Sequence, residues 1–308
     1  MNTLPIESAA NSLPPKVRFS LRRVWLLARA TVTQLVRMKI LAFLVVFCLL
    51  AAGAGFAFSV INPEQQLNLL KSVTLGALQI FSLVIGVVST ALLLPKDLED
   101  RTLYTILSKP VPRFDYLLGK LLGVLLLIGG GLVVMDAVLS LVLWLRQTVL
   151  LDAYLANLRS EKLDSPEAVA QVREIVARQG LTWNLHWAVW AIFLKAAVVS
   201  AVALLLSCIA SSTLFTIVIT FCITIIGHGE ALIREFFLTP NLGGTFNRIA
   251  AFALAVICPD LAQFDIVDGV IAGELVPWSV VGDMTGIAAL YVTVYLFATH
   301  LLFVEKEL

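Results

Sequence analysis

Long apolar stretches are the feature that most limits what this chain can fold into. A helix needs about 20 consecutive apolar residues to cross the hydrocarbon core of a bilayer, and several stretches of this sequence reach that length. Of the 308 residues, 59% are hydrophobic and only 14% are charged, and the mean hydropathy is +0.94. Because a backbone in lipid must satisfy its hydrogen bonds internally, the sequence predicts an all-α integral membrane protein.

The apolar stretches predict six transmembrane helices separated by polar segments of unequal length. The expected spans are residues 40–61, 73–94, 117–144, 186–210, 213–236 and 284–304. Residues 246–257 are apolar but cover only about half a membrane thickness. They favour re-entrant or interfacial helices within a region 241–283 ahead of the last span. The alternative is a seventh crossing, which would place the C-terminal tail, 305–308, on the opposite side.

The longest polar segment, 145–185, shows the signals of a helix of its own. Ser165 and Pro166 have the character of an N-cap followed by the first helical residue, and Gly180 stands where that helix would end. We therefore expect a small helical loop between the third and fourth spans. Trp183 and Trp187 mark the interface where the chain re-enters the membrane.

The N-terminal part combines a polar leader with a basic amphipathic helix. Residues 1–17 are rich in Asn, Ser and Pro, and we expect them to be disordered. On a helical wheel of residues 18–39, Arg22, Arg29 and Arg37 share one side and apolar side chains take the other. This pattern is typical of a helix lying among the lipid headgroups, and a merely solvated basic leader is the alternative.

Lysine and arginine are unevenly distributed between the two sides of the expected bundle. They concentrate before the first span and in the loop 95–116, and they are scarce between 227 and 283. By the positive-inside rule, both termini and the loop 95–116 are expected in the cytoplasm, and the loop 145–185 outside it. The expected location is the inner or plasma membrane of the cell.

The loop 95–116 is charged and bracketed by prolines. Pro95 is expected to close the second span, and Pro110 to stop a short helix that follows it. The first turn of this helix is acidic, which its dipole favours, through Asp97, Glu99 and Asp100. An apolar stripe follows at helical spacing: Leu98, Leu103, Ile106 and Leu107. Such a helix suits the docking of a soluble partner or merely caps the bundle, and the residues alone favour neither.

Several classes of function lack their motifs in this sequence. There is no P-loop, HExxH or GxSxG pattern, so no catalytic residue is assigned. The four cysteines lie singly in apolar runs and the three histidines are scattered, which argues against a metal site. A net charge of +1 argues against a nucleic-acid-binding surface.

Three stretches carry a likeness to a known family. In the loop and the helix after it, the positions concerned are Glu99, Thr102, Leu103, Leu107, Ser108, Pro110, Val111, Arg113, Leu118, Gly119 and Lys120. The others are PDLAQFD at 259–265 and FVEKEL at the C-terminus. The first stretch resembles the loop after the second span in permeases of the ABC-2 exporter family, and the other two are similar to patterns in its copper-processing and uncharacterised members. Arg101 departs from the family, because many members have glycine there.

The resemblance implies a mechanism that the residues alone do not. Two six-span subunits pair, as a homodimer or with a similar permease, and separate ATPase subunits bring ATP and Mg²⁺ to the cytoplasmic side. This chain then holds no cofactor, and its loop is the coupling helix. The residues implied in coupling are Lys96, Asp97, Leu98, Glu99, Asp100, Arg101, Thr102, Leu103, Leu107 and Arg113. Spans with few charges suggest an amphipathic, lipidic or peptide-like cargo.

Polar residues inside the expected spans are the remaining candidates. Asp136 in the third span and Lys195 in the fourth are expected at one depth, where buried charges need partners. We therefore expect an Asp136–Lys195 pair that holds two helices in register, with a role in a polar pathway as the alternative. His228, between two glycines and close to Glu230, indicates a break in the fifth span that either lines a translocation path or is a bare kink.

Two rival functions remain open. An ion- or proton-coupled secondary transporter or channel would use Asp136, Lys195 and His228 as a relay, although such proteins often show internal repeats and none is evident here. A membrane assembly factor without transport would use the loop 145–185 to bind a partner. Small-xxx-small spacings at 119–123 and 282–286 are weak indications of a dimer face.

Overall fold

A computed structural model describes residues 19–37, 63–99, 112–161, 165–210, 212–238 and 258–305, with Val46 and Gly53 as isolated positions. For residues 63–65, 94, 96–99 and 230–238 it describes the backbone alone. These ranges contain helices and their connections and no strand. The expected first span, 40–61, apart from those two positions, and the stretches 100–111 and 246–257 lie outside the described residues.

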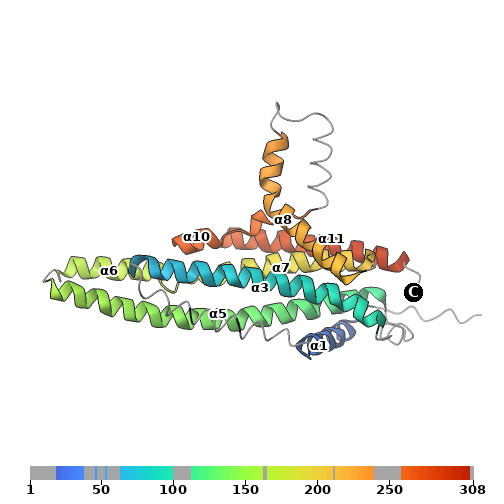
Figure 1. The fold of residues 1–308 in the computed structure, drawn as a ribbon, viewed down its shortest axis with the longest axis horizontal. Coiled ribbons are helices and arrows are strands. Elements are labelled where there is room, and N and C mark those ends of the chain that lie inside the picture. The colour runs from blue at the N-terminus through green and yellow to red at the C-terminus, as the bar shows by residue number, and fades with distance from the viewer. Residues whose placement is uncertain are drawn as a thin grey trace, which may run out of the picture.

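Four long helices run side by side along the longest axis of the molecule (Figure 1). They are α3 (Pro63–Glu99), α5 (Arg113–Ser160), α7 (Asn184–Ile209) and α11 (Trp278–Glu305). The other elements are α1 (Leu21–Arg37), α6 (Pro166–Gln179), α8 (Thr213–Leu238), the 3₁₀ turn η2 (Ala262–Phe264) and α10 (Val267–Ala272). The described residues thus confirm the prediction of an all-α fold.

Four stretches of the described chain are long and apolar enough to cross a membrane. They are Gln66–Leu93, Arg113–Ser160, Pro166–Ile209 and Trp278–Glu305, of which the third contains α7. In α8 the apolar part, Thr213–Gly229, is shorter. The structure therefore has the helices of a membrane protein.

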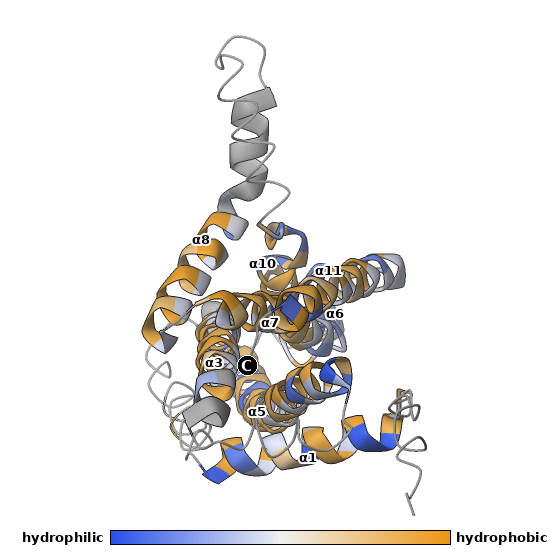
Figure 2. Cartoon of the chain, turned by 90° about the vertical axis from the view of Figure 1, so that its right-hand side faces the viewer, coloured by the Kyte–Doolittle hydropathy of each residue, from blue (hydrophilic) through white to orange (hydrophobic). Residues whose placement is uncertain are grey.

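Helix α7 occupies the centre of the bundle. It contacts α3, α5, α8 and α11, and the view along the bundle shows it among them (Figure 2). Its sequence is apolar on all sides, which is typical of a fully buried helix. Small side chains such as Ala191, Ala196 and Ala201 are completely buried, so the neighbouring helices approach closely. The polar groups in the middle and second half of this helix, Lys195, Ser200 and Ser207, are consequently buried.

Helix α5 extends well beyond its expected end at residue 144. It has 48 residues, which corresponds to about 72 Å at 1.5 Å per residue, more than twice the hydrocarbon thickness of about 30 Å. No glycine or proline stands between 132 and 160, so nothing in the backbone stops the helix. Its far end packs against α6, which returns along it.

Helix α6 has the ends that the sequence predicts. The hydroxyl of Ser165 accepts a hydrogen bond of 3.2 Å from the backbone N–H of Ala168, Pro166 is the first helical residue, and Gly180 is the C-cap. Gln147 of α5 accepts a bond of 3.1 Å from the N–H of Leu181 just beyond this cap. The loop 145–185 is therefore a helical hairpin built from the end of α5 and α6.

Helix α1 lies across the bundle. In Figure 2 it is seen from the side, whereas α3, α5, α7 and α11 are seen along their axes. Its buried face consists of Val24, Ala28, Thr31 and Leu35, and it packs against α5. The small-xxx-small spacing at 119–123 lets α1 pack closely against α5, since a Cβ on Gly123 would lie 2.5 Å from the Cβ of Thr31. These glycines therefore pack against a helix of the same chain.

Helix α3 does not end at Pro95 as the sequence predicts. It runs through this proline to Glu99, so Asp97 and Glu99 belong to its last turn and not to the first turn of a new helix. A proline within a helix removes one backbone hydrogen bond, and membrane helices tolerate this where other groups compensate. The expected end at Pro95 was wrong because proline weakens a helix without always stopping it.

The chain between 258 and 277 folds as short helical turns against the bundle. Leu261, Phe264 and Val270 are buried there. Gly273 ends α10 in the left-handed region with φ of 86°, which glycine adopts without strain. Helix α11 then begins at Trp278, earlier than its expected start at 284. This part of the expected re-entrant region is thus well packed against the bundle.

Candidate functional site: a buried lysine–histidine–aspartate network

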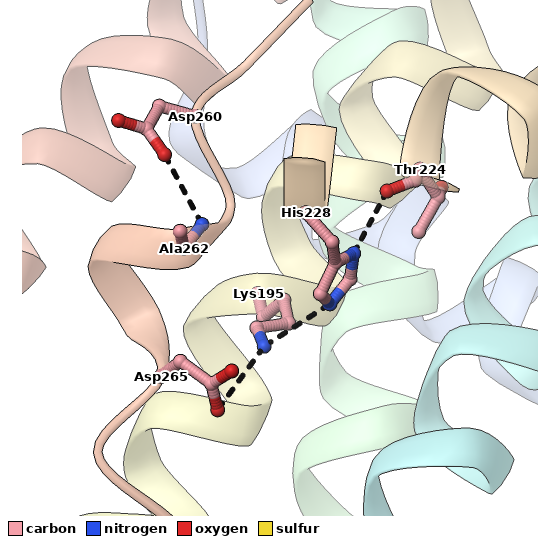
Figure 3. A network of polar contacts seen from close by, with 6 residues as sticks. All are labelled: Lys195, Thr224, His228, Asp260, Ala262 and Asp265. Atoms are coloured by element: carbon pink, nitrogen blue, oxygen red, sulfur yellow. Dashed lines mark hydrogen bonds and ion pairs between the residues drawn. The ribbon is translucent and has the colours of Figure 1, made fainter. Parts of the chain in front are cut away.

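The central helix α7 carries one buried charge, Lys195, which is 1% exposed. Its ammonium nitrogen lies 3.2 Å from Nε2 of His228 on α8 and 3.9 Å from Oδ1 of Asp265 (Figure 3). The aspartate follows the turn η2, so three separate elements meet at this nitrogen. We call Lys195, His228 and Asp265 the Lys195 network.

The protonation of His228 follows from its two hydrogen bonds. Its Nδ1 lies 2.8 Å from the carbonyl oxygen of Thr224, and a carbonyl only accepts, so Nδ1 carries a proton. The ammonium of Lys195 only donates, so Nε2 has to accept. The ring is therefore the neutral tautomer protonated at Nδ1 as long as Lys195 is charged.

The segment that carries Asp265 is held in place by hydrogen bonds. The carboxylate of Asp260 accepts 3.1 Å and 3.0 Å bonds from the N–H of Ala262 and the side-chain amide of Gln263, both of which belong to the turn η2. The N–H of Leu261 donates to the carbonyl of Gly227 at 3.0 Å. These hydrogen bonds fix the turn η2 internally and also tie it to α8. The turn therefore holds Asp265 in place beside Lys195.

The glycines around His228 do not break α8. The helix continues through 227–229 to Leu238 but bends sharply along its length (Figure 1), so the structure shows a kinked helix without an interruption. A Cβ on Gly227 would lie 2.5 Å from the carbonyl oxygen of Pro259, which shows why glycine is needed there. Gly227 therefore permits the backbone of residues 258–261 to approach α8 closely. The side chain of Glu230 lies outside the described residues.

Asp136 and Lys195 do not form the expected pair. Oδ2 of Asp136 lies 2.7 Å from Nδ1 of His186, at the start of α7. From His186 to Lys195 there are nine residues, or about 14 Å along the helix. The prediction placed the outer ends of both spans at one level, whereas α5 continues far past the start of α7. The two helices are therefore shifted relative to the expected register.

A cavity lies beside the Asp136–His186 pair, between α5 and α7. Its volume is about 240 Å³. We call it the α5–α7 pocket, and its lining residues are Gly129, Leu132, Val133, Asp136, His186, Val189, Trp190 and Phe193. The ring of Trp183 contacts that of His186 edge to face at 5.2 Å. The pocket is thus largely apolar with one polar pair in its wall.

Side-chain hydrogen bonds of the expected coupling loop are described at its C-terminal end. Arg113 donates 2.9 Å and 2.8 Å hydrogen bonds to the carbonyls of Phe303 and Val304, near the end of α11. Two residues further, the buried carboxylate of Asp115 accepts bonds from Arg23 at 3.1 Å and from the N–H of Ser20 at 3.3 Å. The start of α5 is therefore tied to both α1 and α11.

The other predicted coupling residues are described less completely. Lys96, Asp97, Leu98 and Glu99 form the last turn of the α3 backbone. Asp100, Arg101, Thr102, Leu103 and Leu107 lie outside the described residues. The ends of α3 and α11, the start of α5 and helix α1 all gather at one end of the bundle (Figure 1).

Sequence reasoning missed two residues of these sites. Asp265 is the acid at the end of the PDLAQFD stretch, and that stretch was the available signal. His186 stands within a cluster of tryptophans that was interpreted only as an interfacial belt. Among the described residues, no three His, Cys, Asp or Glu side chains are grouped to hold a metal ion.

Comparison with known proteins adds no assignment. No protein-family model matches the chain, and no curated protein sequence matches it significantly.

Proposed function

We propose that this chain is the transmembrane permease subunit of an ATP-driven exporter of the ABC-2 type. The proposal rests on the resemblance of the loop 95–116, and one structural observation carries it further. Arg113 and Asp115 join the end of this loop to α11 and to α1. A force applied to the loop would therefore reach the first and last helices at once, which is what a coupling element needs.

The proposed subunit has six spans with both termini in the cytoplasm. In this topology α3, α5, α7 and α11, which are long and apolar enough to cross a membrane, would be the second, third, fourth and last spans. Helix α8 would be the fifth span and residues 40–61 the first. Helix α1 lies across the bundle with Arg22, Arg29 and Arg37 exposed, and it fits the lipid headgroup layer. The helical hairpin of α5 and α6 then projects on the outer side.

The proposed complex contains two permeases and two ATPases. The ATPase subunits bind ATP and Mg²⁺, and they dock on segment 96–113. The second permease is another copy of this chain or a similar one. No described atom lies within 4 Å of a Cβ added at Gly282 or Gly286 on α11, so this small-xxx-small face suits helix packing with the second permease. The cargo is amphipathic, lipidic or peptide-like.

Co-purification with the ATPase tests this proposal. The ATPase encoded beside this chain would be expressed with it, and the tagged permease would be isolated from detergent-solubilised membranes. We expect a stoichiometric complex that hydrolyses ATP. If no P-loop ATPase is encoded nearby, or if the two proteins never co-purify, the exporter proposal fails.

A second candidate function is an ion- or proton-coupled transporter. The Lys195 network favours it, because a buried ammonium next to an imidazole and a half-exposed carboxylate provides the groups of a proton relay. Purified protein in vesicles with an internal pH dye distinguishes the two functions. Proton flux without any ATPase, lost in Lys195→Met, would support the relay and contradict the exporter. An assembly factor would show neither flux nor ATPase binding.

A further inference from the structure

Helix α1 carries positive charge that the described residues do not neutralise. Arg22, Arg29 and Arg37 are exposed, and among the described residues no carboxylate lies within ion-pair distance of them. Residues 8–63 contain seven lysines and arginines and no aspartate or glutamate, although the whole chain has a net charge of only +1. The segments directly before and after α1 therefore supply no counter-charge, and the arginines are available to an anionic partner.

The other exposed side chains of α1 show what kind of surface suits it. Counted at 100° per residue from the buried Val24, an apolar sector lies at roughly 60–120° and the three arginines lie at roughly 140–220°. The apolar sector consists of the exposed or half-buried side chains Leu21, Trp25, Val32 and Val36. Leu26 is exposed within the arginine sector, which suits arginines that bury their stems and reach outward with their charged tips. A bilayer surface offers apolar and charged layers side by side in this order.

The flank beyond the other edge of the buried face is polar. Arg23 donates to the buried carboxylate of Asp115 at 3.1 Å, and Gln34 accepts a bond of 3.3 Å from Lys120. Asp115 lies in the first turn of α5, so this polar flank faces the end of the bundle and the apolar flank faces its middle. Helix α1 also lies across the bundle (Figure 2), in the plane of a membrane that the bundle crosses. The arginines then lie at the level of the lipid headgroups.

The spacing of the arginines lets each of them act separately. They are seven and eight residues apart, or about 10–12 Å along the helix, which is about the distance at which salt screens exposed charges. We propose that α1 binds anionic phospholipids, with Arg22, Arg29 and Arg37 each engaging the phosphate of a separate headgroup. A zwitterionic lipid binds less well, because its choline cation offsets the phosphate. The proposal rests on the proposed placement of α1 in the headgroup layer and does not depend on the exporter function.

Photolabelling of the full-length protein tests this selectivity. The protein is placed in phosphatidylcholine nanodiscs with a small amount of photoreactive phosphatidylglycerol or photoreactive phosphatidylcholine, which carry the reactive group at the same acyl carbon near the glycerol. We expect the phosphatidylglycerol probe to label peptides of α1 at least about tenfold more, since each arginine near an anionic surface contributes about fivefold. Salt at 1 M, where the Debye length is about 3 Å, should lower this ratio several-fold.

Two results of the probe comparison would contradict the proposal in different ways. Equal labelling of α1 by the two probes would overturn the selectivity for anionic lipid and leave the placement of α1 intact. Labelling of α1 by neither probe would overturn the placement in the headgroup layer as well. The comparison needs no substitution, so it decides even if a variant fails to fold.

Matched variants assign the selectivity to the arginines. Replacing the three arginines of α1 by glutamine should bring the labelling ratio close to one, and an unchanged ratio would overturn the proposal. The control makes the same change at three exposed arginines of the α5–α6 hairpin and should keep the ratio: Arg159, Arg173 and Arg178. Selectivity that appears only after Asp97, Glu99 and Asp100 are changed to amides would assign the arginines to these acids instead of lipid, and would also overturn the proposal.

Discussion

Lys195 carries its charge in the interior of a helix bundle, and its neighbours explain how. An ammonium taken out of water is costly unless it is hydrogen-bonded or paired, and here Nε2 of His228 accepts a hydrogen bond and the carboxylate of Asp265 lies at ion-pair distance. The carboxylate is half-exposed, so the network has one end at the surface of the described protein. Lys195 and His228 should therefore depend on each other energetically.

A double-mutant cycle on this pair measures that dependence. We expect Lys195→Met and His228→Ala each to lower the free energy of unfolding, and the double variant to lose less than the sum by about 0.5–2 kcal/mol. The reason is that either single change leaves a buried group of the other residue without its partner. Reversible unfolding in mixed micelles gives the three free energies.

The control for this cycle pairs His228→Ala with Lys71→Met. Lys71 is also buried, but its ammonium donates to the carbonyl of Ile271 at 3.2 Å and shares no partner with His228. These two changes should be additive. Additivity for Lys195 and His228 as well would contradict the network.

At the scale of helices, the contact between α1 and α5 depends on glycine. A Cβ on Gly123 would lie 2.9 Å from the carbonyl oxygen of Ala28, and this backbone atom cannot move independently. We expect Gly123→Ala to destabilise the protein by about 1–3 kcal/mol through overpacking. Gly130→Ala, on the same helix and with no described atom within 4 Å of the added Cβ, should stabilise by about 0.5–1 kcal/mol. Unfolding of both variants in micelles checks this, and a neutral Gly123→Ala would refute the contact.

The sequence predicts these helices better than it predicts their ends and their register. The cap of α6 was predicted because Ser165, Pro166 and Gly180 act locally. The end of α5 was not, because the change to polar residues after 144 does not by itself stop a helix. The partners of Asp136 and Lys195 depend on how far α5 slides along α7, and no single residue encodes that shift. Asp265 reaches Lys195 through a turn far along the chain, which helical periodicity does not reveal.

At the scale of the whole molecule, the proposed topology places α1 and α6 on opposite sides of the membrane. We expect a cysteine at Arg173→Cys on α6 to react with a membrane-impermeant maleimide in intact cells. A cysteine at Arg29→Cys on α1 should react only after permeabilisation. Both positions are exposed, and the four native cysteines would first be replaced by alanine. Labelling of both positions from the same side would contradict the proposed topology.

The central claim is that segment 96–113 transmits the work of a separate ATPase to this chain. ATP turnover of the reconstituted complex, with and without substitutions in the segment, tests it most directly. We predict that Glu99→Ala and Arg101→Ala uncouple or dissociate the ATPase and change turnover several-fold. Glu167→Ala and Arg173→Ala, the same changes at exposed positions of α6 at the other end of the bundle, should leave turnover unchanged. Turnover and complex formation that are equal for all four variants and the unaltered protein would contradict the claim.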